Sequence, residues 1–87
     1  MEPLLDIPEL SALQLAALSI EERAAREARL LAAIPIMRLF LVAPPELRGD
    51  LAGMMQAFVR NLEQLWSEAS APKDVQKFLA DLRRHWP

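Results

Sequence analysis

The chain has 87 residues, a formal net charge of −2 and no cysteine, and 53% of its residues are hydrophobic and 25% charged. This composition is too apolar for a disordered chain and lacks the basic excess of a general nucleic-acid binder. The lack of cysteine excludes disulfides and thiolate metal sites, and the length predicts one small domain over residues 1–87.

The residue types favour helices over strands. Leucine and alanine dominate, only seven residues are Ile or Val, and there are two glycines. Unbranched side chains lose little freedom in a helix, whereas β-branched ones suit a pleated sheet. We therefore predict an all-α fold, a small antiparallel bundle of about four helices. Arginine outnumbers lysine eight to two, a bias typical of GC-rich bacterial genomes.

The first helix is expected over residues 7–18, because Asp6 and Glu9 have the spacing of a capping box. Residues 1–22 hold five acids and no base, the reverse of a secretory signal, which predicts a cytoplasmic protein. This acidic arm could lie against the basic C-terminal helix, within one chain or between two chains.

A second helix is expected over residues 20–42. Ser19 and Glu22 repeat the capping-box spacing directly before it. Pro35 removes one backbone hydrogen bond inside this helix and clashes with the preceding turn, so we predict that the helix is kinked or broken there.

Residues 30–45 are apolar on all sides and contain one charged residue, Arg38. The segment is shorter than the roughly 20 residues that span a bilayer, and we predict no membrane span. So small a bundle can scarcely enclose it, so part of it should meet another chain. Arg38 is expected at a helix edge near that interface, or paired with a carboxylate such as Asp6 or Asp50.

The last two helices are expected over residues 45–68 and 71–85, after Pro44-Pro45 and with Ser70 as the cap of the final helix. Helical spacing gives each helix a central apolar stripe. The stripe of the third helix is Leu47, Leu51, Met54, Phe58, Leu62 and Leu65, and that of the fourth is Val75, Phe78, Leu79, Leu82 and Trp86.

Methionine and aromatic residues beside these stripes are candidates for a protein interface, where such residues are enriched. We expect Met54, Phe58 and Trp86 to lie in the core. The predicted partner-binding residues, which flank the stripe or lie in the apolar segment, are Met37, Arg38, Phe40, Leu41, Met55, Val59 and Trp66.

Other patterns have simpler structural explanations. His85 is the only histidine and suits the C-terminal turn of a helix, so we predict no metal, cofactor or catalytic site. The charge run at residues 21–29 suits a solvated face with pairs Glu22–Arg26 and Arg23–Glu27. Gly49 and Gly53 either seat the alanine-rich face of the second helix or are exposed.

The sequence thus predicts a non-enzymatic protein-protein interaction module: a homodimer, adaptor, chaperone or inhibitor that buries the second and third helices against another chain. The partner would be another protein or a second copy, with no small-molecule substrate. An alternative is a transcriptional or nucleic-acid-associated regulator that contacts phosphates through Lys73, Lys77, Arg83 and Arg84, although the acidic N-terminus disfavours nucleic acid. A third possibility, an apolar segment lying in a membrane interface, has a weak basic flank.

Overall fold

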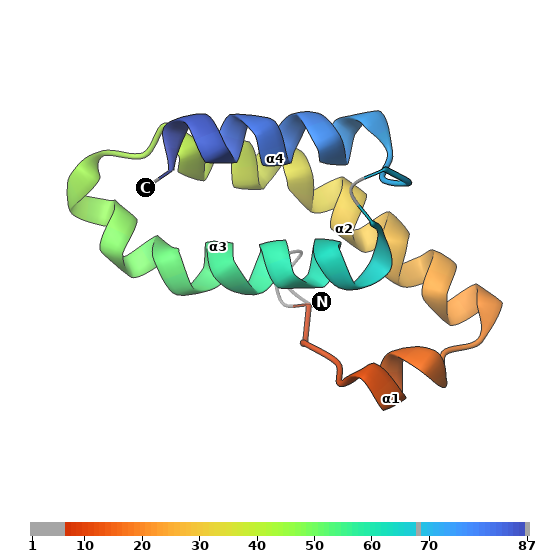
Figure 1. Cartoon of the computed structure of the whole chain (residues 1–87). Helices are drawn as coiled ribbons and strands as arrows, with labels where there is room; N and C mark the ends of the chain where they lie inside the picture. The colour runs from red at the N-terminus through yellow and green to blue at the C-terminus, as the bar shows by residue number, and fades with distance from the viewer. Residues whose placement is uncertain (1–6, 68, 87) are drawn as a thin grey trace.

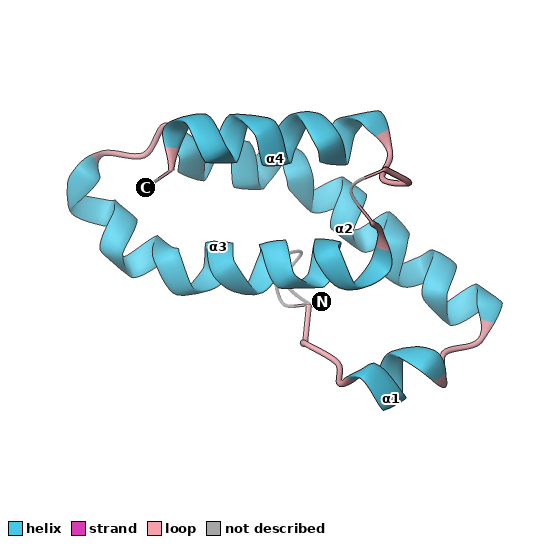
Figure 2. Ribbon diagram, viewed as in Figure 1, coloured by secondary structure: helices cyan, strands magenta, loops and turns pink. Residues whose placement is uncertain are grey.

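A computed structural model describes residues 7–67 and 69–86, and that part of the chain is helical without strands (Figure 2). Its helices are α1 (Ala12–Ala16), α2 (Ile20–Leu41), α3 (Pro45–Leu65) and α4 (Lys73–His85). The predicted all-α fold is confirmed. Among the described residues, no helix is long and apolar enough to cross a membrane.

The longest helix, α2, is the element against which α3 and α4 pack. It contacts both α3 and α4, whereas the backbones of α3 and α4 stay farther from each other. Figure 1 shows α3 and α4 running in opposite directions, with α2 crossing obliquely behind them. The short α1 lies apart from this three-helix arrangement, near the N-terminal end of α2 (Figure 1).

The first helix is much shorter than predicted. Residues 7–10 are not helical, and α1 begins after Ser11, whose side chain accepts a hydrogen bond from the Gln14 backbone at 3.1 Å. The Gln14 side chain accepts one from the Ser11 backbone at 2.9 Å, which completes a capping box. Asp6, the predicted cap, lies outside the described residues. The sequence holds two capping signals here, and the second one starts the helix.

The start of α2 is as predicted. Ser19 and Glu22 form a reciprocal capping box with distances of 3.0 and 3.1 Å. The helix continues through Pro35, so the broken alternative is wrong, while a kink stays a prediction. Pro35 has no N–H to donate to the carbonyl of Leu31, one turn earlier in the helix. Because Pro35 is exposed, this carbonyl lies toward the solvent-facing side of the helix.

The boundaries of α3 and α4 differ from the prediction at two ends, the end of α3 and the start of α4. α3 begins at Pro45 as expected but ends at Leu65. α4 begins at Lys73 with Pro72 as its N-cap, so Ser70 does not cap it. The Ser70 hydroxyl instead contacts the Ser67 hydroxyl at 2.8 Å within the preceding turn.

The core lies where α2, α3 and α4 meet. Phe58 of α3 and Phe78 of α4 pack edge to face, with ring centroids 5.5 Å apart. This geometry is favoured by the aromatic quadrupole and brings the two helices together above α2. The buried apolar residues are Ile7, Leu30, Ala33, Ile34, Met37, Leu41, Met55, Phe58, Leu62, Leu65, Ala71, Val75 and Phe78.

The predicted stripe of α3 is correct in its C-terminal half and wrong in its N-terminal half. Met54 is 44% exposed and Leu47 is 50% exposed, whereas Met55 is 1% exposed. Leu82 and Trp86 of α4 lie on the Met55 side of α3. Both α2 and α4 cover α3. Its buried face is therefore centred nearer to Met55 than to Met54, on which the predicted stripe was centred.

Met55→Ala should lower the free energy of unfolding by about 2–5 kcal/mol, since it leaves a cavity in the core. Met54→Ala is the matched control and should change it by less than about 1 kcal/mol. Urea unfolding followed by circular dichroism measures both. Equal losses for the two variants would contradict this orientation of α3.

The glycine stripe of α3 is exposed rather than packed on the alanines of α2. A Cβ built at Gly49 or Gly53 would meet no neighbouring atom within 4 Å, and neither glycine has a positive φ. Neither a close approach nor the backbone conformation requires glycine at these positions.

Gly53→Ala should therefore stabilise the chain by about 0.4–1 kcal/mol, because alanine restricts the unfolded chain and favours the helix. The midpoint of urea unfolding should rise while its slope stays unchanged. A destabilised variant would show that another group approaches this face.

Candidate protein-binding groove

An apolar groove follows the junction between α3 and α4. It consists of two hollows, of about 280 and 190 Å³, which share Glu63 in their linings. We call this surface the α3–α4 groove. Its lining residues from α3 and the following turn are Met55, Gln56, Val59, Arg60, Leu62, Glu63, Trp66, Ser67 and Ala71, and those from α4 are Val75, Leu79, Leu82, Arg83 and Trp86.

The groove arises because α3 and α4 are both packed on α2 but diverge above it. The fully or nearly buried Met55, Leu62 and Val75 lie at its base. Val59 and Leu79 are half-buried, pack against the core and still line the groove. The opening therefore exposes the edge of the hydrophobic core itself.

A tryptophan lies toward each end of the groove. Trp66 follows α3 and Trp86 follows α4, and each backbone N–H donates to the carbonyl of Leu62 or Leu82 at 3.1 or 2.8 Å. Both indoles are half-buried against the core. Such rings offer a large, rigid contact area to a partner.

Trp86 is oriented by an arginine from the start of α3. The Arg48 guanidinium lies 5.7 Å from the centroid of the Trp86 ring. Arg48 also donates to the carbonyls of Ala43 and Leu41 at 3.3 and 3.4 Å, which satisfies acceptors at the C-terminal end of α2. One side chain thus joins three helix ends beside the groove.

The rims of the groove carry charges of opposite sign. Glu63 is exposed on α3 and Arg83 is exposed on α4, and both line the same hollow. Arg60 lines the other hollow and donates to the Glu9 carboxylate at 2.6 Å. This last pair shows that Glu9 of the acidic N-terminal arm contacts α3 and not the basic C-terminal helix of its own chain. A contact between two chains stays a prediction.

The structure divides the predicted partner-binding residues into core and groove. Met37 is fully buried and Leu41 is 5% exposed, so both belong to the chain's own core. Phe40 is half-buried against that core on α2, away from the residues that line the groove. Val59, Trp66 and the base residue Met55 meet in the groove. Burial of the inner face of α2 by α3 and α4 leaves Met37 and Leu41 no open surface.

Sequence reasoning missed the contribution of α4. Leu79, Leu82 and Trp86 were assigned to its core stripe, yet all three are half-buried and line the groove. That stripe has the width usual for a helix with one buried face, so no feature of the sequence separated its groove residues from its buried ones.

Arg38 pairs with a carboxylate, which was one of the two predicted alternatives, and that carboxylate belongs to Asp81. Its Nη1 lies 2.7 Å from Asp81 Oδ2 of α4, and its guanidinium lies 5.9 Å from the Phe78 ring centroid. Hydrogen bonding from Arg38 lowers the pKa of Asp81, and the positive charges of Arg38, Arg84 and Lys77 act in the same direction. Asp6 lies outside the described residues, and Asp50 is not the partner.

Asp81→Asn should lower stability at neutral pH and flatten its acid dependence. A carboxylate with a lowered pKa in the folded state adds stability above its unfolded pKa of about 3.9, and this is lost as pH falls through the folded value. Thermal unfolding at a series of pH values should show the two curves converging in acid. Asp50→Asn, at an exposed site on α3, is the control, and parallel curves for Asp81→Asn would contradict the pairing.

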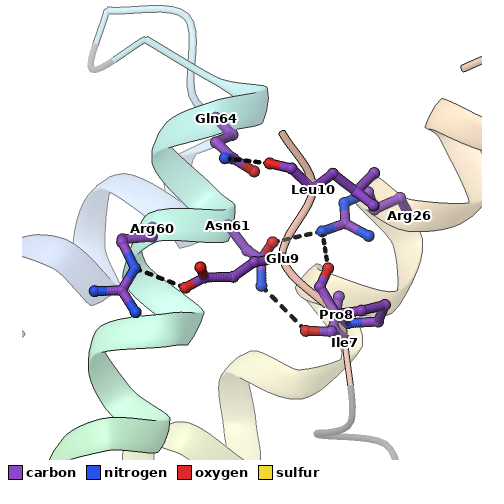
Figure 3. Close-up of polar contacts among 8 residues, drawn as sticks. All are labelled: Ile7, Pro8, Glu9, Leu10, Arg26, Arg60, Asn61 and Gln64. Carbon is purple, nitrogen blue, oxygen red and sulfur yellow. Dashed lines mark hydrogen bonds and ion pairs between the residues drawn. The ribbon is translucent and has the colours of Figure 1, made fainter. Parts of the chain in front are cut away.

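A second polar cluster attaches the N-terminal segment to the bundle (Figure 3). Arg26 of α2 is buried, and its Nη2 donates to the Pro8 carbonyl and to Asn61 Oδ1 of α3. Asn61 Nδ2 in turn donates to the Ile7 carbonyl at 3.3 Å. Burial lowers the pKa of Arg26, and the nearby charge of Arg29 adds to this effect.

This arrangement corrects part of the predicted charge run. Arg23 and Glu27 pair as expected at 3.5 Å. Glu22 caps its own helix, and Arg26 turns inward instead of pairing with it. The sequence feature that could have indicated a buried partner for Arg26 was Asn61, a polar residue at helical spacing from the buried Phe58 and Leu65. Gln64 completes the attachment by donating to the Leu10 carbonyl at 2.8 Å.

The basic residues of α4 do not share one face. Lys73, Lys77 and Arg84 are exposed at helical spacing on its outer side, while Arg83 lines the groove. His85 is exposed in the last turn of the helix. Within residues 7–67 and 69–86, no group of three or more His, Asp or Glu side chains is placed to hold a metal ion.

Comparison with known proteins gives no relative. The chain matches no protein-family model, no curated protein and no solved structure.

Proposed function

We propose that this chain is a non-enzymatic protein-binding module that holds an apolar surface of another chain in the α3–α4 groove. The observation that carries the proposal is the open edge of the core between α3 and α4, lined by Val59, Trp66, Leu79 and Trp86. A chain that covers this edge would complete the hydrophobic core that α2, α3 and α4 form only on one side.

The dimensions of the groove suit helical elements. Its lining on α3 extends from Met55 to Trp66, which is about 16 Å at a rise of about 1.5 Å per residue. This length accommodates about three turns of a facing helix. An amphipathic helix recognises such a groove through apolar anchors at i, i+3, i+4 and i+7. An adaptor, a chaperone, an inhibitor and a homodimer would all use this mode of binding.

Site-specific crosslinking in cells that naturally express the chain tests this function. A photoreactive phenylalanine analogue at Gln56, on the exposed rim, should form a discrete adduct with a protein chain. The same analogue at Ala28, on the exposed side of α2, is the control and should not form that adduct.

A matched pair of valine variants then links the adduct to the groove. Val59→Glu places a charge in the groove and should reduce the Gln56 adduct by about tenfold or more, because burial of an unpaired charge opposes association. Val42→Glu changes a valine that is 78% exposed outside the groove and should have little effect. Circular dichroism confirms the fold of both variants. An adduct that survives Val59→Glu, or none from Gln56, would contradict the proposed function.

A further inference from the structure

We infer that a hollow between the N-terminal segment and α2 binds a small aliphatic monocarboxylate, whose negative charge pairs with the buried Arg26. The hollow has a volume of about 320 Å³, and its lining residues are Leu10, Leu18, Glu22, Ala25, Arg26 and Arg29. None of these residues lines the α3–α4 groove. The site is therefore independent of the proposed function, and either of the two can fail alone.

The positive charge of Arg26 has no counter-ion among the described residues. Arg26 is only 9% exposed, and its Nη2 donates to two neutral oxygens, the Pro8 carbonyl and Asn61 Oδ1 (Figure 3). Within residues 7–67 and 69–86, no carboxylate forms an ion pair with it. Removal of a charge from water is costly, so a buried guanidinium is normally paired with an anion. An anion in the hollow would supply the missing charge.

Arg26 also keeps an unused hydrogen-bond donor. Its Nε is buried and has no partner within the part of the chain that the structure describes. A guanidinium carries five N–H donors in a planar fork, which matches the two oxygens of a carboxylate. Because Arg26 borders the hollow, a carboxylate bound there lies beside this fork.

The apolar part of the lining defines the rest of the ligand. Leu10 precedes α1, Leu18 follows it, and Ala25 faces them from α2, so a hydrocarbon chain would contact apolar side chains on both sides. The volume lies at the lower end of the range for ligand pockets, about 300–1,000 Å³. It corresponds to roughly ten groups of the size of a water molecule, at about 30 Å³ each. A carboxylate with a chain of about eight carbons has this size.

The charges of the lining favour a monoanion over a dianion such as phosphate. Glu22 lines the hollow, and its carboxylate accepts a hydrogen bond from the Ser19 backbone at 3.0 Å. This bonding lowers the pKa of Glu22, so the carboxylate is charged at neutral pH. Arg29 already interacts within its own chain, and the ligand is anchored by Arg26. One negative charge at the rim repels a dianion more strongly than a monoanion.

Calorimetric titration of the full-length chain with octanoate tests the site. We expect saturable binding of one octanoate per chain below about 1 mM. The thermal unfolding midpoint should rise with octanoate concentration, because the site exists only in the folded state. Octanamide has the same chain without the charge and should bind at least about tenfold more weakly. Inorganic phosphate should not bind.

A matched pair of leucine variants places the binding in this hollow. Leu18→Glu puts a negative charge beside the ligand carboxylate and should weaken octanoate binding by about tenfold or more. Leu13→Glu changes a residue that is 84% exposed on α1 and does not line the hollow, so its binding should equal that of the unmodified chain. Circular dichroism confirms the helicity of both variants.

Arg26→Gln tests the role of the buried charge. Glutamine keeps an N–H donor but removes the positive charge, so this variant should lose the preference for octanoate over octanamide. If Arg26→Gln does not fold, the leucine pair decides alone. Equal binding of octanoate and octanamide by the unmodified chain would overturn the inference, as would octanoate binding that survives Leu18→Glu. Absence of octanoate binding at about 1 mM, as expected if residues 1–6 fill the hollow, would also overturn it.

Discussion

The inner face of α2 is the surface on which the rest of the structure is built. Leu30, Ala33, Ile34 and Met37 are buried on this face, and no other described helix contacts two neighbours in this way. One helix that supports two others fixes their spacing. The buried Phe58–Phe78 contact joins them at the base, while their backbones remain apart above it. The groove is a direct result of this arrangement.

Polar interactions around the core connect its helices and the N-terminal segment. Arg38 bridges α2 to α4 through Asp81, and Arg48 satisfies carbonyls at the end of α2 while lying against Trp86. Arg26 and Asn61 attach the N-terminal segment to the opposite side of the bundle. These arginines lie among apolar residues, where a guanidinium requires partners, and each of them therefore fixes a contact between segments far apart in sequence.

The groove connects the small hydrophobic core of the chain to its proposed function. A chain of 87 residues has little core to spare, and here part of the core edge, including Trp66 and Trp86, remains open to solvent. Association through this edge would add buried apolar area without new secondary structure.

The sequence by itself determined the helical fold, the Ser19–Glu22 cap and the start of α3 at Pro45, because these depend on local propensity and on contacts within one turn. It also indicated Val59 and Trp66 as surface candidates. Only the tertiary structure decided that Met55 is buried and Met54 exposed, that Met37 and Leu41 are core, and that Arg38 pairs with Asp81. An apolar stripe shows which face of a helix avoids water, but the number and position of the neighbours decide which residues of that face are covered.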